Sequence, residues 1–402
     1  MESIKDKVAI VGMGCCKFGE NWEKDAQDMA VEACYEAFED AGLEPKDIQA
    51  GWMATLITGE TGSMLSRWLK LEYVPITRVE NFCCGGLDAF RNACFSVASG
   101  TYDIALACGV EKLLDHQPGG FGKCFPAPFD LAGVDYDLAP VNMFAWVASR
   151  YMQVYGTSYE QLKRTLAKIE VKNHHNGMLA PKSHLKREIT EEDVINAPII
   201  SWPLGMYDCC GLSDGAAAAI VTTPEIAKSL RSDYVLVKAA SIANGAGQAF
   251  LRGDNSMLGR GPKVEMNFPE TWYAAKAAYE QAGIKEPRNE ITHCELHDCF
   301  SVTELLTYED LGFSPIGHAH EDVEAGRFTL NGEQPVNTDG GLKSYGHPLS
   351  ASGLRMMYEV YKQLQGKAGP RQVKNPKLGM AHNLGGSSAY FNVGIIIVGS
   401  RD

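Results

Sequence analysis

A pattern of strand, helix and glycine, found near the start of the chain and again later, constrains the fold most. Residues 7–13 (KVAIVGM) form an apolar run that suits a strand buried on both faces. Apolar residues then recur at helical spacing from residue 25 to 41, and Gly42 supplies a helix stop. The end of this helix, residues 37–43 (AFEDAGL), reads almost like residues 278–284 (AYEQAGI), which follow a strand-like run at 234–240. A chance match is the alternative, but the parallel order of elements favours a duplicated α/β layered fold with two similar halves.

The composition restricts the class of protein. The chain has 402 residues, of which 45% are hydrophobic and 22% charged, as in soluble globular proteins with large cores. A net charge of -13 argues against a nucleic-acid or anionic-membrane surface. We expect a cytoplasmic protein, because neither a secretory signal nor an apolar stretch of membrane-spanning length is evident. Twelve cysteines without a CxxC pair indicate reduced thiols rather than disulfides or structural zinc.

The residue composition of the chain changes between residues 121 and 196. Prolines interrupt this part, and it contains no run typical of a buried strand. Residues 161–187 carry seven Lys or Arg, with Glu170 as the one acidic residue. Composition alone favours a solvated helical insertion, although a cationic insertion in an acidic protein can also serve a phosphorylated ligand. We therefore predict one half from residues 1–120 plus 197–230, an insertion at 121–196 and a second half at 231–402.

Two cysteine-bearing motifs are candidates for chemistry. In residues 81–90 (NFCCGGLDAF) a cysteine precedes a Gly-Gly turn that opens a helix, where Cys83 or Cys84 is either a nucleophile or a small buried residue. In residues 293–300 (HCELHDCF) an extended backbone would place Glu295, His297 and Cys299 on one face. A metal site built from Cys294, His297 and Cys299 is disfavoured, because Cys294 would face the other way.

Two glycine-bearing motifs complete the set. Residues 346–348 (GHP) place His347 at the start of a helix, followed by the small residues 350–353, and a capping or core histidine is the alternative. Residues 382–388 (HNLGGSS) suggest a glycine-rich turn that presents backbone donors to an oxyanion.

These motifs together resemble the thiolase superfamily, most closely the sterol-carrier-protein-type and archaeal-type thiolases. The nucleophile pattern Cys-x-[Ser/Gly]-Gly-x-x-Ala matches residues 83–89, a register that selects Cys83. The sterol-carrier branch motifs occur at 297–300 (HDCF), 303–309 (TELLTYE) and 382–385 (HNLG), and Gly-His-Pro occurs at 346–348. The likeness runs from residue 7 to about residue 398, in the family order.

The resemblance implies a thiolase, an acyl-CoA C-acyltransferase that cleaves or forms 3-oxoacyl-CoA through an acyl-cysteine. Cys83 would be the nucleophile, His347 its base, Cys299 the acid/base at the α-carbon, and His297 an orienting group. Backbone groups of Cys83 and of Gly385 and Gly386 would form the oxyanion hole, and His382 and Asn383 would bind substrate. Coenzyme A would be a substrate rather than a cofactor, and no metal or redox group is implied.

The resemblance also bears on domains and partners. The insertion at 121–196 corresponds to the loop domain that covers coenzyme A in the family, and a homodimer or higher oligomer is implied. Some archaeal-type members work with a small subunit that combines a zinc ribbon and an OB-fold. The branch includes acetoacetyl-CoA thiolases and enzymes for bulky substrates such as benzoylsuccinyl-CoA. The segment 119–140, rich in Phe and Pro, is either a wall of a wide acyl pocket or a surface loop.

Other functions stay open. A ketoacyl synthase would normally carry a Cys-His-His set, and a hydroxymethylglutaryl-CoA synthase a glutamate acid/base, so the Cys299 thiol argues against both. A non-catalytic acyl-CoA-binding scaffold is the alternative from another class, and it has no physical need of two thiols and an imidazole.

Overall fold

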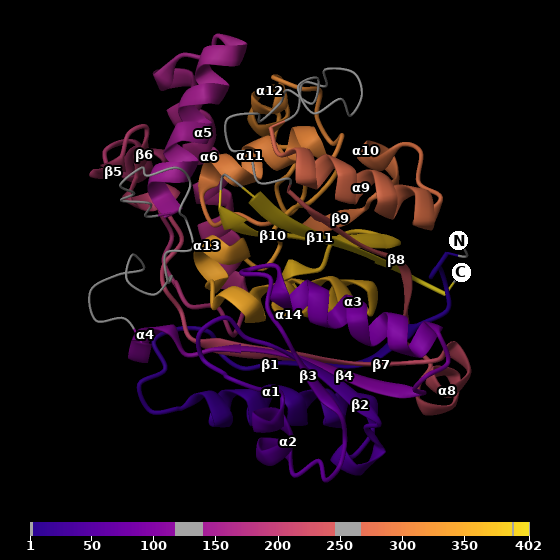
Figure 1. Ribbon diagram of the computed structural model, residues 1–402. Coiled ribbons are helices and arrows are strands. Elements are labelled where there is room, and N and C mark those ends of the chain that lie inside the picture. Colours follow the sequence, from indigo (N-terminus) through magenta and orange to yellow (C-terminus); the bar gives the residue numbers. More distant parts are fainter. Residues whose placement is uncertain (1–2, 117–139, 246–266, 388–389, 402) are drawn as a thin grey trace.

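Two layers of strands, separated by a pair of buried helices, form the framework of the computed structural model (Figure 1). It describes residues 3–116, 140–245, 267–387 and 390–401. In these residues nine strands belong to one hydrogen-bonded sheet in the order β3-β2-β4-β7-β1-β8-β11-β10-β9. Their bounds are β1 Ala9–Cys15, β2 Ala50–Ala54, β3 Ile76–Val79, β4 Ile104–Glu111, β7 Gly215–Thr222, β8 Val235–Asn244, β9 His293–Glu295, β10 Leu378–Ser387 and β11 Tyr390–Gly399. A separate two-stranded ribbon pairs β5 (Ile199–Ser201) with β6 (Leu204–Gly205).

The two halves meet where β1 pairs with β8. This junction has only two residue pairs, Ala9 with Leu236 and Ile10 with Val235. By contrast, β7 pairs with β4 from Gly215 to Thr222. One layer therefore contains β1–β4 and β7, and the other contains β8–β11 (Figure 1).

Helices fill the space between the strand layers and cover their outer faces. Helices α3 (Gly85–Ala98) and α14 (Leu349–Leu364) lie between the layers, while α1 (Ala26–Ala41) and α2 (Ser63–Leu69) cover one outer face (Figure 1). The opposite outer face is covered by α9 (Pro269–Ala282), α10 (Pro287–Glu290), α11 (Ser301–Asp310) and α12 (Ala319–Glu324). Short helices are α4 (Leu113–His116), α8 (Pro224–Leu230) and α13 (Gly341–Tyr345), of which α13 is buried and packs on α6. The expected α/β layered fold is confirmed, with its layers in the order α-β-α-β-α.

The two sequence-related helix ends take the same conformation. Gly42 follows α1 with φ 69° and Gly283 follows α9 with φ 80°, both in the left-handed region. That conformation costs glycine little and lets it end a helix. Because α1 packs on β1 and α9 packs on β8, the repeated sequence marks equivalent positions in the two halves.

The central helices approach each other closely at glycine positions. A Cβ added at Gly86 on α3, or at Gly109 on β4, would lie 2.4 Å from the carbonyl oxygen of Ser350 on α14. This distance is far inside van der Waals contact, so both positions require glycine. Backbone packing thus fixes how the starts of α3 and α14 face each other.

Residues 140–196 are helical, as expected from their sequence. They form α5 (Pro140–Tyr155), α6 (Tyr159–Leu179) and α7 (Glu191–Ile195). The expectation of a solvated insertion is wrong for the inner face of α6, because Lys163 is buried in an ion pair with Asp208 and Lys172 in one with Glu304. Ion pairing lets the helix bury charges that composition alone assigns to water. No helix in the described residues is long and apolar enough to cross a membrane.

Candidate active site

A strained turn places Cys83 immediately before α3. Phe82 adopts φ 53°, a left-handed conformation that costs a non-glycine residue about 1–3 kcal/mol. Cys84 is the N-cap of α3, and its backbone N–H donates to the carbonyl of Asn81 at 3.1 Å. The turn separates two adjacent thiols, because Cys83 lines a large cavity whereas Cys84 is fully buried.

The start of α14 brings His347 to the same cavity. Its ring Nδ1 lies 2.8 Å from the hydroxyl of Ser352, one turn into the helix. Its backbone N–H donates to the hydroxyl of Ser213 at 3.3 Å. These contacts fix the ring and leave Nε2 as the nitrogen that can exchange a proton with Cys83.

Residues 296–300 carry His297 and Cys299 to the opposite side of the cavity. Asp298 anchors this segment, because its carboxylate accepts hydrogen bonds from Leu342 N at 2.6 Å and Asn173 Nδ2 at 3.0 Å. Glu295 does not join His297 and Cys299 in the cavity lining, since its carboxylate pairs with Arg355 at 2.7 Å.

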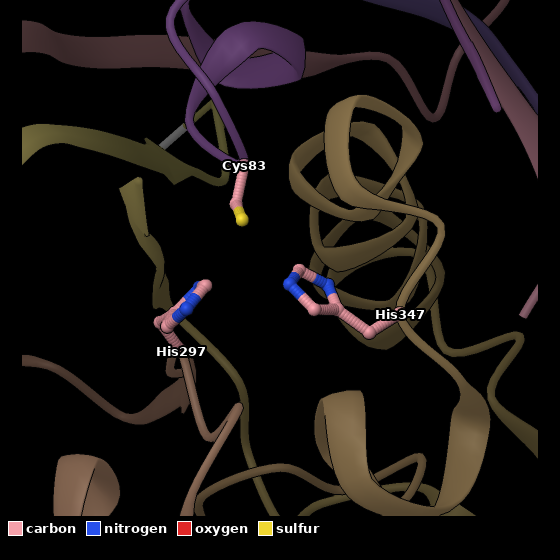
Figure 2. Close-up of side chains that lie close together, drawn as sticks. All are labelled: Cys83, His297 and His347. Atoms are coloured by element: carbon pink, nitrogen blue, oxygen red, sulfur yellow. The ribbon is translucent and has the colours of Figure 1, made fainter. Parts of the chain in front are cut away.

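Three side chains from these segments converge (Figure 2). The Cys83 sulfur and one ring nitrogen each of His297 and His347 all lie within 4.8 Å of one another. The two imidazole rings meet edge to face, with centroids 5.3 Å apart. Residues more than 200 positions apart in the sequence therefore form one thiol–imidazole cluster.

Burial controls the protonation of this cluster. It raises the pKa of the Cys83 thiol above its ordinary value. It also lowers the pKa of His347 to about 3, with a smaller contribution from the Arg355 charge, and lowers that of His297 well below its usual range. The position of Cys83 at the start of α3 does not outweigh burial. Before a ligand binds, the cluster therefore holds a neutral thiol and two neutral imidazoles, and either imidazole can accept a proton.

Three further thiols, those of Cys209, Cys210 and Cys299, line the same cavity. Cys299 is buried, its sulfur lies 3.8 Å from the hydroxyl of Thr303, and burial raises its pKa. Cys210 also lines the cavity, and its backbone N–H donates to the carbonyl of Cys299 at 3.0 Å. The sequence motifs do not single out the segment around Cys210 and Ser213. Bridges of Cys209 with Phe300 and of Leu212 with His347 bring this segment to the site.

The glycine-rich segment expected to be a turn is strand up to Ser387. The prediction of a turn is wrong for residues 382–386, because His382 pairs with Ile395 and Gly386 pairs with Phe391 in the β10–β11 ladder. Gly385 and Gly386 line the cavity. A Cβ at Gly385 would lie 2.6 Å from Cys83 N, so the two backbones are in direct contact.

His382 and Asn383 lie beside this contact but outside the cavity lining. His382 Nε2 is 3.0 Å from the hydroxyl of Thr271, and burial lowers the pKa of the ring to about 3. Asn383 Nδ2 contacts the sulfur of Met356 at 3.3 Å. Their role in substrate binding stays a prediction.

The cavity has a volume of about 830 Å³ and an apolar interior. Its apolar walls include Leu56, Phe82, Val141, Phe144, Met206, Phe300, Leu349 and Leu384. Its basic lining consists of His174, His184, Lys186, Arg187 and Lys343. A ligand with an apolar body and an anionic end fits such a surface. Residues 119–139, expected as an acyl-pocket wall or a surface loop, lie outside the described residues.

Comparison with known families identifies the two halves. Residues 8–225 match the family described as thiolase, N-terminal domain. Residues 263–397 match the family described as thiolase C-terminal domain-like.

Individual relatives agree with this match. The chain is 36% identical to an acetyl-CoA acetyltransferase of Methanothermobacter thermautotrophicus, over 94% of this chain and 96% of the relative. It is 33% identical to sterol carrier protein 2 of Oryctolagus cuniculus, over 94% of this chain and 70% of that protein.

Solved structures share the fold. The structure described as Ltp2-ChsH2(DUF35) aldolase has a TM-score of 0.82 at 24% identity, covering 99% of each chain. The Acat5 thiolase from Ascaris suum in complex with coenzyme A has a TM-score of 0.68 at 16% identity, covering 98% of this chain and all of that one.

Proposed function

Because this chain belongs to the thiolase family, we propose that it is an acyl-CoA C-acyltransferase that transfers acyl groups through Cys83. The observation that carries the proposal is the Cys83–His297–His347 cluster at the apolar cavity. A thiol attacks a thioester efficiently when an adjacent imidazole removes its proton.

In the first half-reaction the Cys83 proton passes to His347 while the sulfur bonds to the carbonyl carbon of the acyl-CoA. The bond between that carbon and the sulfur of coenzyme A then breaks, and coenzyme A leaves with the proton. Backbone N–H groups of Cys83 and of the Gly385–Gly386 segment stabilise the oxyanion. Their contact at the cavity wall supports this assignment.

In the second half-reaction the thiolate of Cys299, whose own proton has passed to solvent, removes an α-proton from a second acyl-CoA and later returns it to the departing Cys83 sulfur. The resulting enolate attacks the acyl-Cys83 carbonyl carbon, and the Cys83 sulfur leaves. His297 and His347 orient the thioester oxygen. In the direction of thiolysis the same steps run in reverse. The position of Cys299 in the cavity lining supports this role.

The basic end of the cavity suits the phosphates of coenzyme A. Lys186 and Arg187 are exposed there, beyond the end of α6. Lys186 donates to the carbonyl of Gly177 at 3.1 Å, so we assign the main phosphate contact to Arg187. Arg187→Ala should raise the KM for coenzyme A about tenfold and leave kcat unchanged. An unchanged KM for coenzyme A would show that another residue makes the main phosphate contact.

The organisation of the chain follows from the same proposal. Residues 121–196 act as a loop domain over coenzyme A, between halves formed by 1–120 plus 197–230 and by 231–402. The enzyme works as a dimer or larger oligomer, and a small partner with a zinc ribbon and an OB-fold completes it. The aldolase of similar fold, whose name contains a DUF35 component, supports the search for such a partner.

Intact-protein mass spectrometry after incubation with acyl-CoA tests the proposal. The wild type and Cys84→Ala should each gain one acyl group, which peptide mapping places on Cys83, whereas Cys83→Ala should gain none. A label on Cys84 would refute the assignment. A panel of 3-oxoacyl-CoAs is tested with and without co-purified small proteins. If these compounds bind but never acylate the chain, the hypothesis of a non-catalytic scaffold replaces that of an enzyme.

A further inference from the structure

The thiol–imidazole cluster also has the composition of a zinc site. Zinc prefers thiolate sulfur and neutral imidazole nitrogen as ligands. In a tetrahedral site these atoms would be about 3.3–3.6 Å apart, given metal–ligand bonds of about 2.0–2.3 Å. The sulfur of Cys83 and the ring nitrogens of His297 and His347 lie within 4.8 Å of one another. Small side-chain rotations therefore suffice to close the set around one ion.

A second observation concerns the hydrogen bonds of the two imidazoles. His297 is 1% exposed, and its buried Nδ1 has no hydrogen-bond partner among the described residues, so no hydrogen bond from that nitrogen holds the ring. His347 has the support that metal-bound histidines usually have, because Ser352 contacts its Nδ1 at 2.8 Å. The His297 ring can thus adjust its position, while the His347 ring is already oriented by Ser352.

The surroundings provide room for a fourth ligand. All three side chains line the 830 Å³ cavity, so a water molecule can complete the tetrahedron. Within residues 3–116, 140–245, 267–387 and 390–401, this is the one group of three or more Cys, His, Asp or Glu residues with ligand atoms close enough to share an ion.

We propose that Cys83, His297 and His347 bind one Zn²⁺ reversibly, and that the metal-bound form is inactive because zinc occupies the Cys83 sulfur. Binding releases the thiol proton to solvent and forms a sulfur–zinc bond, with no change in oxidation state. The metal competes with acyl-CoA and shields Cys83 from electrophiles. This site differs from the disfavoured set of Cys294, His297 and Cys299, because Cys294 lies in β9 away from the cavity.

The binding test uses Co²⁺ and Zn²⁺ alone with the full chain after removal of bound metals. Co²⁺ should give one equivalent of a thiolate-to-metal charge-transfer band, which Zn²⁺ abolishes by displacement. Cys83→Ala should lose the band, and His297→Gln should weaken binding at least ~100-fold, since even loss of a supporting contact costs 10–100-fold. Cys84→Ala, a neighbouring thiol, and His318→Ala, an exposed imidazole, serve as controls and should bind as the wild type does.

Alkylation gives an independent readout. Saturating Zn²⁺ should slow the reaction of Cys83 with iodoacetamide at least tenfold in the wild type and little in His297→Gln. Unchanged metal affinity in folded Cys83→Ala, or equal alkylation rates with and without zinc, would overturn the proposal. The test needs no catalytic turnover, so a chain that fails to form an acyl-enzyme can still bind zinc, and the reverse also holds.

Discussion

The contact between Gly385 and the Cys83 turn allows a quantitative test of the proposed oxyanion site. In Gly385→Ala the added methyl group would lie 2.6 Å from Cys83 N, 2.7 Å from Asn81 O and 2.7 Å from Cys84 N. Gly385 does not adopt a positive φ, so the clash rather than backbone strain is the cost. All three neighbours are backbone atoms and cannot rotate away.

The size of the effect follows from these distances. Ordinary contact begins near 3.4 Å, so the turn or β10 must move by about 0.8 Å. A misplacement of about 1 Å in a reacting group costs about 100-fold in rate, equivalent to about 2.7 kcal/mol of barrier. Overpacking should also lower the free energy of unfolding by about 1–3 kcal/mol.

The assay is the rate of acyl-Cys83 formation, followed by mass spectrometry under single-turnover conditions. We expect Gly385→Ala to acylate about 100-fold more slowly than the wild type, with native circular dichroism. Gly211→Ala is the matched control, because a Cβ at this cavity glycine would meet no atom within 4 Å. A folded Gly385→Ala protein that acylates at the wild-type rate would refute the role of this contact.

Substitutions at three other residues test two contacts of the site and one buried carboxyl group outside it. Cys299→Ala should still acylate Cys83 but lose at least ~100-fold in complete turnover, and normal turnover would reject Cys299 as the α-carbon acid/base. Ser352→Ala should slow acylation about tenfold because His347 loses its Nδ1 contact, whereas Ser352→Thr should retain most activity; equal rates for both would contradict this. Burial raises the pKa of Glu170 well above its ordinary value, and neither of its carboxylate oxygens has a hydrogen-bond partner among the described residues. The stability that depends on protonated Glu170 is present below about pH 4.3, the unfolded-state pKa, and declines as pH rises through the folded-state pKa. Glu170→Gln should therefore gain in Tm relative to the wild type between pH 4 and pH 8, and a constant difference would show that Glu170 is not protonated on folding.

Local patterns predicted the elements of the fold because each depends on nearby residues. The helix ending at Gly42 and the apolar run that becomes β1 are visible in the sequence, since glycine stops helices and buried strands are continuously apolar. Burial of Lys163 was not predictable, because its partner Asp208 lies 45 residues away.

The candidate site was predictable only in part for the same reason. The residues alone left Cys83 and Cys84 open, and the resemblance to the thiolase motif selected Cys83, which the structure brings beside His347. Ser352 was noted only as a small residue, because its contact with His347 depends on how α14 begins. Cys210 reaches the cavity through pairing with a segment almost 90 residues later, which no local pattern reveals.

The close contact of the central helices at glycine positions controls reactivity, whereas the side chains of the cavity walls control selectivity. Gly86 and Gly109 meet the Ser350 carbonyl directly, so main-chain atoms set the spacing between the starts of α3 and α14. Walls such as Phe144 and Met206 belong to other segments and take no part in that crossing. Replacing those walls can therefore reshape the cavity, while the main-chain contacts that set the spacing between Cys83 and His347 are kept.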